Sequence, residues 1–382
     1  MRGVAGWDIV TGQWDELAAT VRTRVDGLVA SGDEAGVQVA AYLDGEPIID
    51  VVAGVADART GRPMTADTPI FSLSTGKGLT ATVVHVLAER GHLDYDLRIA
   101  DVWPEYARHG KDATTLRHAL THAAGVPALP ADIRAEDFAD WDRMCALIAD
   151  ARPEWPPGTA HGYHAWTFGW LVGETVRRAT GRTVSEVLAT EIAAPLGVPG
   201  ELFFGVPDDQ LDRLAHLDDR NWSAAFETLA GHLPNLDRVA PPGVRPDATI
   251  GNRRDVLRAD VPAVGTMTAR AAARLFAALV GRVGGVRLIS PARLRAATAP
   301  ATSGPDWVFG QPVSMGLGYA IDGGGAWFGA SGSGGSLAYG FPELGLSVAA
   351  TRNRLAFDAD DDPMEDLRAL IQDSVSRRRG AW

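Results

Sequence analysis

The stretch most able to do chemistry is FSLSTGKGLT, residues 71–80, in which a serine is followed three residues later by a lysine. If Ser74 opens a helix, Lys77 lies about one turn further on the same face, so its amine can reach the hydroxyl. Serine becomes a nucleophile when a base takes its proton, and a lysine screened from water has a lowered pKa. We therefore predict acyl transfer through Ser74, with Lys77 as its base.

Other interpretations of this stretch remain open. A phosphate loop needs G-x-x-x-x-G-K-[ST], but Phe71 occupies the place of the first glycine and Gly78 follows the lysine. Ser74 could be only a helix N-cap, with Lys77 a solvated helix residue, and Ser72 is a competing hydroxyl. The position favours the nucleophile, because predicted β structure gives way here to a helix whose N-terminal N–H groups can bind an oxyanion.

A second element, PPGTAHGYHAWTFGW, supplies a candidate proton relay, Tyr163, in a loop before a predicted helix. We expect a phenol beside a cationic Lys77 to be more acidic than usual and to return the proton to the leaving group. A packing role for the ring is the plain alternative. A third element, WFGASGSGGSLAYGF, has glycines that let an edge strand approach a ligand closely.

No metal or cofactor is expected. His118 with His122, and His161 with His164, lack the acidic partner of an H-E-x-x-H motif, so these histidines are interpreted as structural or hydrogen-bonding residues. Cys145 is the single cysteine, which excludes an internal disulfide and indicates a packed core thiol.

The pattern of elements predicts an α+β fold. Residues 13–31 have helical spacing, and two apolar runs flank Asp44-Gly45, which is typical of a hairpin. From about 75 to 265 the chain is mostly helical and loop-like, with helices expected in 78–91, 167–181 and from Thr268 onward. Short strands are expected in 314–322, 325–331, 336–341 and 345–353. A final helix has acidic residues and Pro363 at its start and arginines at its end, so its aspartates favour a helix N-terminus over a metal site.

We therefore expect one antiparallel sheet built from both ends of the chain, flanked by the terminal helices, with an all-helical insertion. The predicted domains are 1–75 with 266–382, an α/β sandwich, and 76–265, a helical domain with substrate-cleft loops. The stretch 205–250 shows no clear period, and irregular stretches of that length are usually functional or mobile.

The composition limits the class of protein. The 382 residues carry a net charge of -12, which argues against nucleic acids and anionic membranes as partners. No window approaches the roughly 18 apolar residues of a membrane span. Residues 1–20 also lack the apolar run of a signal peptide, so the cytoplasm is the expected compartment. The sequence does not indicate an oligomeric state.

Together these elements resemble the serine β-lactamase and penicillin-binding-protein superfamily, and in particular its class C-like branch, with family VIII carboxylesterases and related acyltransferases. The resemblance covers nearly the whole chain, through LSTGKG, TLRHALTHAAGVP, PPGTAHGYHAWTFGWLVGETVRRATGR, EIAAPLGV and FGASGSGGSLAYGFPELGLSVAATRN. It implies an α/β sandwich with a helical domain. It further implies Ser74 as nucleophile, Lys77 as base partner and Tyr163 as proton relay.

The resemblance also implies an oxyanion hole from the backbone N–H groups of Ser74 and Ser333, and substrate contacts from His164, Ser331 and Gly332. The chain departs from the family at two places. Ala165 stands where β-lactamases have the Asn of Tyr-x-Asn. Ala330 opens the triplet that is usually Lys-Thr-Gly or His-x-Gly.

These features favour a serine hydrolase that acts on small ester or activated acyl substrates through an acyl-Ser74 intermediate. The alternative is a transacylase of secondary metabolism that passes the acyl group to an alcohol or amine. A β-lactamase or D-amino peptidase is less favoured, because both substitutions remove groups that bind such substrates. A binding or sensor protein on the same fold is disfavoured by the intact Ser74, Lys77 and Tyr163. Arg213, Arg220 and Arg238 are candidates for binding a substrate carboxylate from 205–250.

Overall fold

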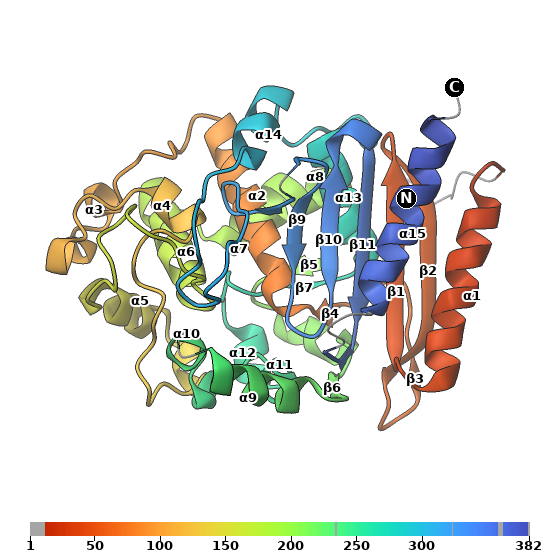
Figure 1. The fold of residues 1–382 in the computed structure, drawn as a ribbon, viewed down its shortest axis with the longest axis horizontal. Helices are drawn as coiled ribbons and strands as arrows, with labels where there is room; N and C mark the ends of the chain where they lie inside the picture. The colour runs from red at the N-terminus through yellow and green to blue at the C-terminus, as the bar shows by residue number, and fades with distance from the viewer. Residues whose placement is uncertain (1–11, 234, 323, 358–361, 381–382) are drawn as a thin grey trace.

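Strands from both ends of the chain pair in one antiparallel sheet, as predicted (Figure 1). The computed structural model describes residues 12–233, 235–322, 324–357 and 362–380. Within these residues seven strands run in the order β3-β2-β1-β11-β10-β9-β8. Their bounds are Gly36–Leu43 (β1), Glu46–Asp57 (β2), Arg62–Pro63 (β3), Ala320–Ile321 (β8), Phe328–Ser331 (β9), Leu337–Phe341 (β10) and Leu346–Arg352 (β11).

The β1–β2 hairpin turns at the expected dipeptide. Asp44 and Gly45 have φ of 51° and 87°, the left-handed backbone that a tight hairpin turn requires. On its other side β1 pairs with β11, in a register that sets Val37 opposite Arg352 and Leu43 opposite Leu346. This pairing joins the N-terminal and C-terminal strands in the middle of the sheet.

Helices cover both faces of this sheet. The terminal helices, α1 (Asp15–Ser31) and α15 (Pro363–Arg379), pack on one face through fully buried residues such as Val21, Val25 and Ile371. On the other face, α13 (Ala269–Val280) contacts β1, β10 and β11, and Thr268 caps it by accepting a bond from the N–H of Ala271. Opposite charges complement the ends of α15, as expected. Of the aspartates placed at its start, Asp358, Asp360 and Asp361 lie outside the described residues.

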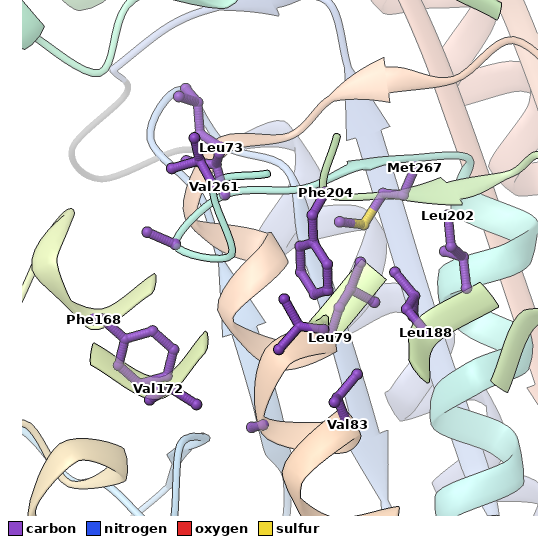
Figure 2. Packing of buried hydrophobic residues seen from close by; sticks show 14 of the residues in the cluster. Leu73, Leu79, Val83, Phe168, Val172, Leu188, Leu202, Phe204, Val261 and Met267 are labelled. Atoms are coloured by element: carbon purple, nitrogen blue, oxygen red, sulfur yellow. The ribbon is translucent and has the colours of Figure 1, made fainter. Parts of the chain in front are cut away.

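The middle of the chain is mainly helical and lies to one side of the sheet (Figure 1). Figure 2 shows Leu79 and Val83 of α2 packed beside Phe204 and Leu188. Cys145 lies buried on α5, as expected. The helices are Gly76–Glu89 (α2), Ile99–Val102 (α3), Leu116–Leu120 (α4), Trp141–Asp150 (α5), Thr167–Thr180 (α6), Val184–Val187 (α7), Ala194–Leu196 (α8), Trp222–His232 (α9), Leu236–Val239 (α10), Ala248–Gly251 (α11), Arg254–Arg258 (α12) and Pro291–Thr298 (α14).

β4 (Ile70–Phe71) lies where β structure was predicted to give way to a helix. The structure adds short strands that the sequence did not indicate: β5 (Leu202–Phe203) pairs, like β4, with β7 (Thr266–Met267), and β6 (Asp218–Asp219) pairs with β12 (Arg354–Leu355). Conversely, the strand expected over 314–322 is confined to β8, because the glycines of residues 316–318 turn the chain before it. The division into two domains stays a prediction, since one buried apolar cluster spans both parts.

The part of the chain that the structure describes has no helix long and apolar enough to cross a membrane. The argument against a signal peptide rests on residues 1–20, and residues 1–11 lie outside the described part of the chain. The cytoplasmic compartment therefore remains a prediction.

Candidate active site

Ser74 lies in a strained 3₁₀ turn, Leu73–Thr75, at the junction between β4 and α2. Leu73 has a φ of 49°, a left-handed conformation that is unfavourable for a branched residue and typical of functional sites. The turn is held from behind by two backbone hydrogen bonds, from Ser72 N–H to Gly265 O (2.8 Å) and from Gly265 N–H to Leu73 O (3.0 Å). The side chain of Ser72 is buried and donates to Ile70 O, whereas Ser74 lines a cavity. This difference favours Ser74 over Ser72 as the reactive hydroxyl.

The start of α2 is pressed against a neighbouring segment. A Cβ on Gly76 would overlap the backbone of Val264 and Gly265, so only glycine allows this approach. Segment 263–265 thereby lies next to the first turn of α2. The Ala263 carbonyl of this segment accepts a hydrogen bond from Lys77, the next residue of α2.

Lys77 is buried and surrounded by oxygen atoms. Its Nζ lies 3.1 Å from Ser74 Oγ, 2.7 Å from Ala165 O and 3.0 Å from Ala263 O. Burial lowers the pKa of Lys77 to about 7, as the sequence argument required. Because both carbonyl oxygens can only accept, they take the two N–H bonds of the neutral amine. The lone pair is then left for the Ser74 hydroxyl, which donates to it.

Tyr163 completes the group. Lys77 Nζ lies 4.8 Å from the centre of its ring, and the phenol and Ser74 line the same cavity. The expectation of an acidic phenol is wrong: burial raises the pKa of Tyr163 to about 12. Because the pKa of Lys77 is itself lowered to about 7, the amine is only partly charged near neutral pH, and the desolvation of the phenolate dominates. Tyr163 therefore keeps its proton and acts as a hydrogen-bond donor.

The four histidines make structural hydrogen bonds or pack near the site. His164 is fully buried, accepts from Val126 N–H through Nε2 (3.2 Å) and donates through Nδ1 to Gly162 O (2.6 Å). Both nitrogens are used and the side chain does not line the cavity, so the structure does not bring His164 to a substrate as expected. His122, which the sequence argument did not select, lines the cavity and accepts from His164 N–H. His118 caps α4. His161 is buried, and its Nε2 has no hydrogen-bond partner among the described residues.

The glycine-rich turn after β9 reaches the nucleophile, as the third element predicted. A Cβ on Gly332 would overlap Ser72 O and lie 2.8 Å from Thr75 Oγ1, so the strand end touches the turn that carries Ser74. Thr75 Oγ1 donates to Ser336 O (2.9 Å) and fastens the two segments together. Ser331, Gly332 and Ser333 all line the cavity with Ser74. The N–H groups of Ser74 and Ser333 are thus candidates for one oxyanion hole.

The cavity has a volume of about 670 Å³, enough for a small organic substrate. Lys77 is the sole lysine and no arginine, aspartate or glutamate is present among the described lining residues. Ala165 and Ala330, the two departures from the family pattern, both form part of the wall. A substrate carboxylate would therefore meet little positive charge here.

The arginines proposed for a carboxylate are engaged elsewhere. Arg213 donates to Asp67 O (2.8 Å), Arg220 pairs with Asp33 (3.1 Å) and Arg238 pairs with Glu154 (2.9 Å). None of the three lines the cavity. The structure therefore does not bring these three arginines to the cavity, because each is bonded to an acceptor elsewhere.

A second, apolar wall of the cavity was missed by sequence reasoning. It is formed by Trp222, Phe226 and Leu229 of α9 and by Leu233, the residue that caps the C-terminus of this helix. Their spacing of four, three and four residues is the signal that could have revealed an amphipathic helix inside 205–250. Phe309 completes this apolar wall, in a loop fixed by bonds from Val308 and Phe309 N–H to the Asp306 carboxylate (2.7 and 3.1 Å).

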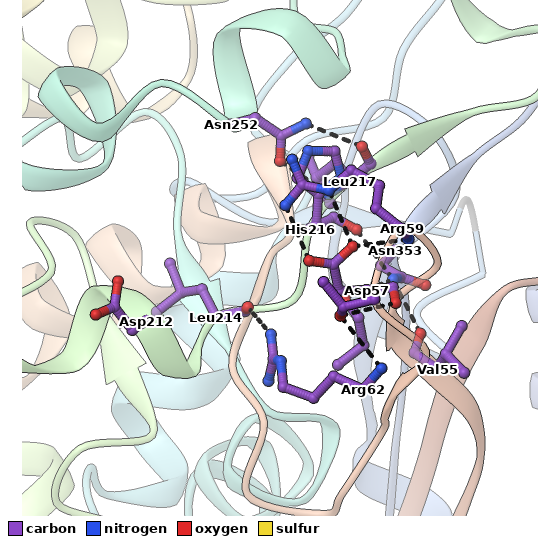
Figure 3. A network of polar contacts seen from close by, with 12 residues as sticks. Val55, Asp57, Arg59, Arg62, Asp212, Leu214, His216, Leu217, Asn252 and Asn353 are labelled. Atoms are coloured by element: carbon purple, nitrogen blue, oxygen red, sulfur yellow. Dashed lines mark hydrogen bonds and ion pairs between the residues drawn. The ribbon is translucent and has the colours of Figure 1, made fainter.

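The segment that leads into α9 is fixed to the large sheet. The amide of Asn353, just after β11, donates to His216 O (3.0 Å) and to Val55 O of β2 (3.1 Å) (Figure 3). Asn252 exchanges two hydrogen bonds with the backbone of Leu217, both 2.9 Å. The start of α9 is therefore anchored, although Phe226 is the one residue of this helix that is buried.

Comparison with known proteins agrees with this architecture. The β-lactamase family model matches residues 21–373. The chain is 33% identical to the esterase/β-lactamase LipL of Mycobacterium tuberculosis (strain ATCC 25618 / H37Rv) over 333 residues, 84% of this chain and 77% of that protein. The crystal structure of a family VIII carboxylesterase superposes with a TM-score of 0.82 at 32% identity, over 94% of this chain and 97% of that one.

A shorter match, 28% identical over 189 residues, is to the monacolin J acid methylbutanoyltransferase of Aspergillus terreus and covers 42% of this chain and 44% of that protein. The match of the family model to nearly the whole chain confirms the predicted resemblance and the α+β fold. The chain therefore belongs to the β-lactamase family.

Proposed function

We propose that this protein is a serine hydrolase of neutral esters, which acts through an acyl group on Ser74. The observation that carries the proposal is the contact of Lys77 Nζ with Ser74 Oγ at 3.1 Å, with both remaining neighbours of the amine being carbonyl acceptors. The esterase among the relatives and the family VIII carboxylesterase structure support the same reaction class.

Acylation begins when neutral Lys77 takes the proton of Ser74 as Oγ attacks the ester carbonyl carbon. The negative charge that develops on the carbonyl oxygen is stabilised by the N–H groups of Ser74 and Ser333. Tyr163 donates its hydrogen bond to the departing alkoxide, which leaves as the alcohol once it has the proton. The proton on Lys77 then restores the phenol, and the acyl group remains on Ser74.

Deacylation reverses these roles. A water molecule attacks the acyl carbon while the neutral amine of Lys77 accepts its proton. The bond between the acyl carbon and Ser74 Oγ then breaks, and a proton returns to the serine. The products are the free acid and the unchanged enzyme. An alcohol or amine in place of water would give a new ester or amide by the same steps. The methylbutanoyltransferase relative supports this second outcome, so a transacylase is the alternative function.

The substrate class follows from the cavity wall. The side chains of Ala165 and Ala330 provide neither an amide nor a cation, and no arginine is among the described residues that line the cavity. A buried carboxylate without a partner costs several kcal/mol, or at least about a hundredfold in acylation. Esters with neutral apolar acyl chains avoid that cost, whereas penicillins and cephalosporins carry a carboxylate.

The test compares p-nitrophenyl butyrate with nitrocefin in one buffer and follows the enzyme by intact-mass analysis. We expect a transient mass increase equal to the butyryl group, and kcat/KM for the ester to exceed that for nitrocefin by about a hundredfold or more. If kcat/KM for nitrocefin equals or exceeds that for the ester, β-lactamase replaces esterase as the proposed main activity. Repeating the ester assay with added alcohols and amines separates the two functions, since a transacylase forms the new ester or amide in preference to the acid.

A further inference from the structure

The turn that carries Ser333 rests on a buried arginine. Arg352, the last residue of β11, is completely buried, and so is its partner Glu34, which precedes β1. Arg352 Nη1 donates to Glu34 Oε1 at 2.7 Å. An arginine is almost never fully buried without a specific set of partners, so its surroundings require an explanation.

The guanidinium is bonded to the turn between β9 and β10. Arg352 Nε donates to Gly334 O, and Nη2 donates to Ala356 O (3.2 Å) and lies 3.8 Å from Asp362 Oδ2. The contact with the turn is so close that a Cβ on Gly335, which has a φ of 104°, would overlap the guanidinium. The charged group therefore packs directly under the two residues that follow Ser333.

The backbone of the same arginine holds the far end of the turn. Arg352 N–H donates to Ser336 Oγ (3.3 Å), while Ser336 O accepts from Thr75 Oγ1 on the nucleophile side. Within the turn, Gly332 N–H bonds to Ser336 O (2.8 Å) and Gly335 N–H bonds to Gly332 O (3.0 Å). The turn between β9 and β10 is thus held by Arg352 and, through Thr75, by the 3₁₀ turn that carries Ser74.

A buried ion pair is a poor device for stability alone. Desolvation of both charges offsets much of their attraction, and apolar side chains of similar volume often serve as well. The guanidinium does offer several donors in a rigid plane, which can hold a backbone carbonyl in one direction while the carboxylate fixes the plane itself. The geometry suits orientation of the turn better than it suits filling of the core.

We propose that Arg352, oriented by Glu34, is a positioning residue for the oxyanion hole: it sets the Gly334 carbonyl and thereby the direction of the Ser333 N–H. The inference rests on the proposed function, because it assumes that this N–H stabilises the tetrahedral intermediate. Arg352 touches no substrate. Its loss leaves substrate binding unchanged and weakens the enzyme's hold on the transition state, since oxyanion stabilisation depends on donor geometry.

The experiment compares Arg352→Met and Glu34→Gln with a matched control, Arg270→Met. Arg270 on α13 forms a two-bond ion pair with the buried Glu201 at 2.7 Å, but it does not contact the turn. For each protein we would measure kcat and KM for p-nitrophenyl butyrate, the melting temperature, and the inhibition constant of phenylboronic acid. The boronic acid adds reversibly to a serine and places a negatively charged tetrahedral oxygen in the oxyanion hole.

In Arg352→Met we expect kcat to fall by roughly 10- to 100-fold, somewhat less than the loss of a whole oxyanion donor. The inhibition constant should rise by the same factor, while KM stays within about twofold, because the same misplaced donor affects both tetrahedral species. Glu34→Gln should give a smaller change in the same direction, at least threefold in both quantities by the same principle. The control should lose melting temperature without these changes.

Unchanged kcat and boronic acid inhibition in a folded Arg352→Met would overturn the inference, and so would equal losses in Arg270→Met. If Arg352→Met does not fold, Glu34→Gln decides: wild-type values in that variant also overturn it. The proposed function is checked separately on the wild type with a fluorophosphonate. Absence of a label on Ser74 would mean that the proposed function is wrong. If Ser74 is labelled but the Arg352 variant has wild-type kcat and boronic acid inhibition, only the positioning role is wrong.

Discussion

The two walls of the cavity are built in opposite ways. On one side, Ser74, Lys77 and Tyr163 are fixed by short polar contacts, a strained turn at Leu73 and a close glycine contact. On the other side, α9 presents apolar side chains and is itself little buried apart from Phe226. Many specific contacts therefore fix the position of the polar wall, whereas few fix that of the apolar wall.

This difference teaches which wall controls which property. Proton transfer and oxyanion stabilisation need groups within hydrogen-bonding distance, so the polar wall tolerates little displacement. Contacts with an apolar chain are additive and undirected, so α9 can change the preferred substrate without a change in the reaction. Substitutions on the polar wall should therefore lower kcat, whereas substitutions on α9 should change the ratio between substrates.

The largest expected effect is that of Ser74→Ala. Removal of the nucleophile should lower kcat for p-nitrophenyl butyrate by at least about 10⁴-fold, the scale seen when a nucleophile is removed from a catalytic unit. Ser72→Ala is the matched control and should keep most of the activity, because its hydroxyl donates to Ile70 O away from the cavity. A large loss in the control alone would exchange the roles of the two serines.

Lys77→Ala and Tyr163→Phe should each lower kcat by roughly 100-fold or more, the usual contribution of general acid–base groups. Lys111 offers a control, since it is a second buried lysine with bonds to Ala149 O and Ala151 O and a pKa lowered to about 8 by burial. Lys111→Met should change the melting temperature and leave kcat near the wild-type value. Higher KM with normal kcat in the Lys77 or Tyr163 variants would assign those residues to binding instead.

The pH dependence should show a single rising limb. Neutral Lys77 is the active form and its pKa is about 7, so kcat/KM falls as pH drops and amine becomes protonated. One pH unit below that pKa, the loss should be about tenfold. Tyr163, with a pKa of about 12, keeps its proton and causes no fall up to about pH 10. A profile that is flat between pH 5 and pH 8, measured below the melting temperature at each pH, would remove Lys77 as the base.

The smallest effect is expected on the apolar wall. Leu233→Trp narrows the cavity beside α9, so it should lower kcat/KM for p-nitrophenyl octanoate relative to the acetate by about tenfold, a typical value for contacts with a few methylene groups. Thr228→Ala lies on the exposed side of the same helix and should leave the ratio unchanged. Equal losses for both esters would show that α9 affects the reaction itself and would weaken the contrast between the walls.

The same contrast explains what the sequence could predict. Ser74 and Lys77 are neighbours along one helix, so their contact follows from local spacing, and the hairpin at Asp44-Gly45 follows from turn chemistry. The pKa of Tyr163 depends on burial created by distant segments, and that prediction failed in sign. Segment 205–250 alternates short helices with loops, so the stripe of α9 was too brief to stand out from the surrounding irregular chain. The support of the Ser333 turn by Arg352 depends on its pairing with Glu34, which lies 318 residues away in the chain, so no local pattern reveals it.

The most direct test of the central assignment is covalent labelling with a fluorophosphonate, followed by peptide mass spectrometry. We predict one label per chain on Ser74, no label in Ser74→Ala, a normal label in Ser72→Ala, and slower labelling in Lys77→Ala because the serine has lost its base. Labelling that persists in Ser74→Ala, or that maps to Ser72 in the wild type, would contradict the account.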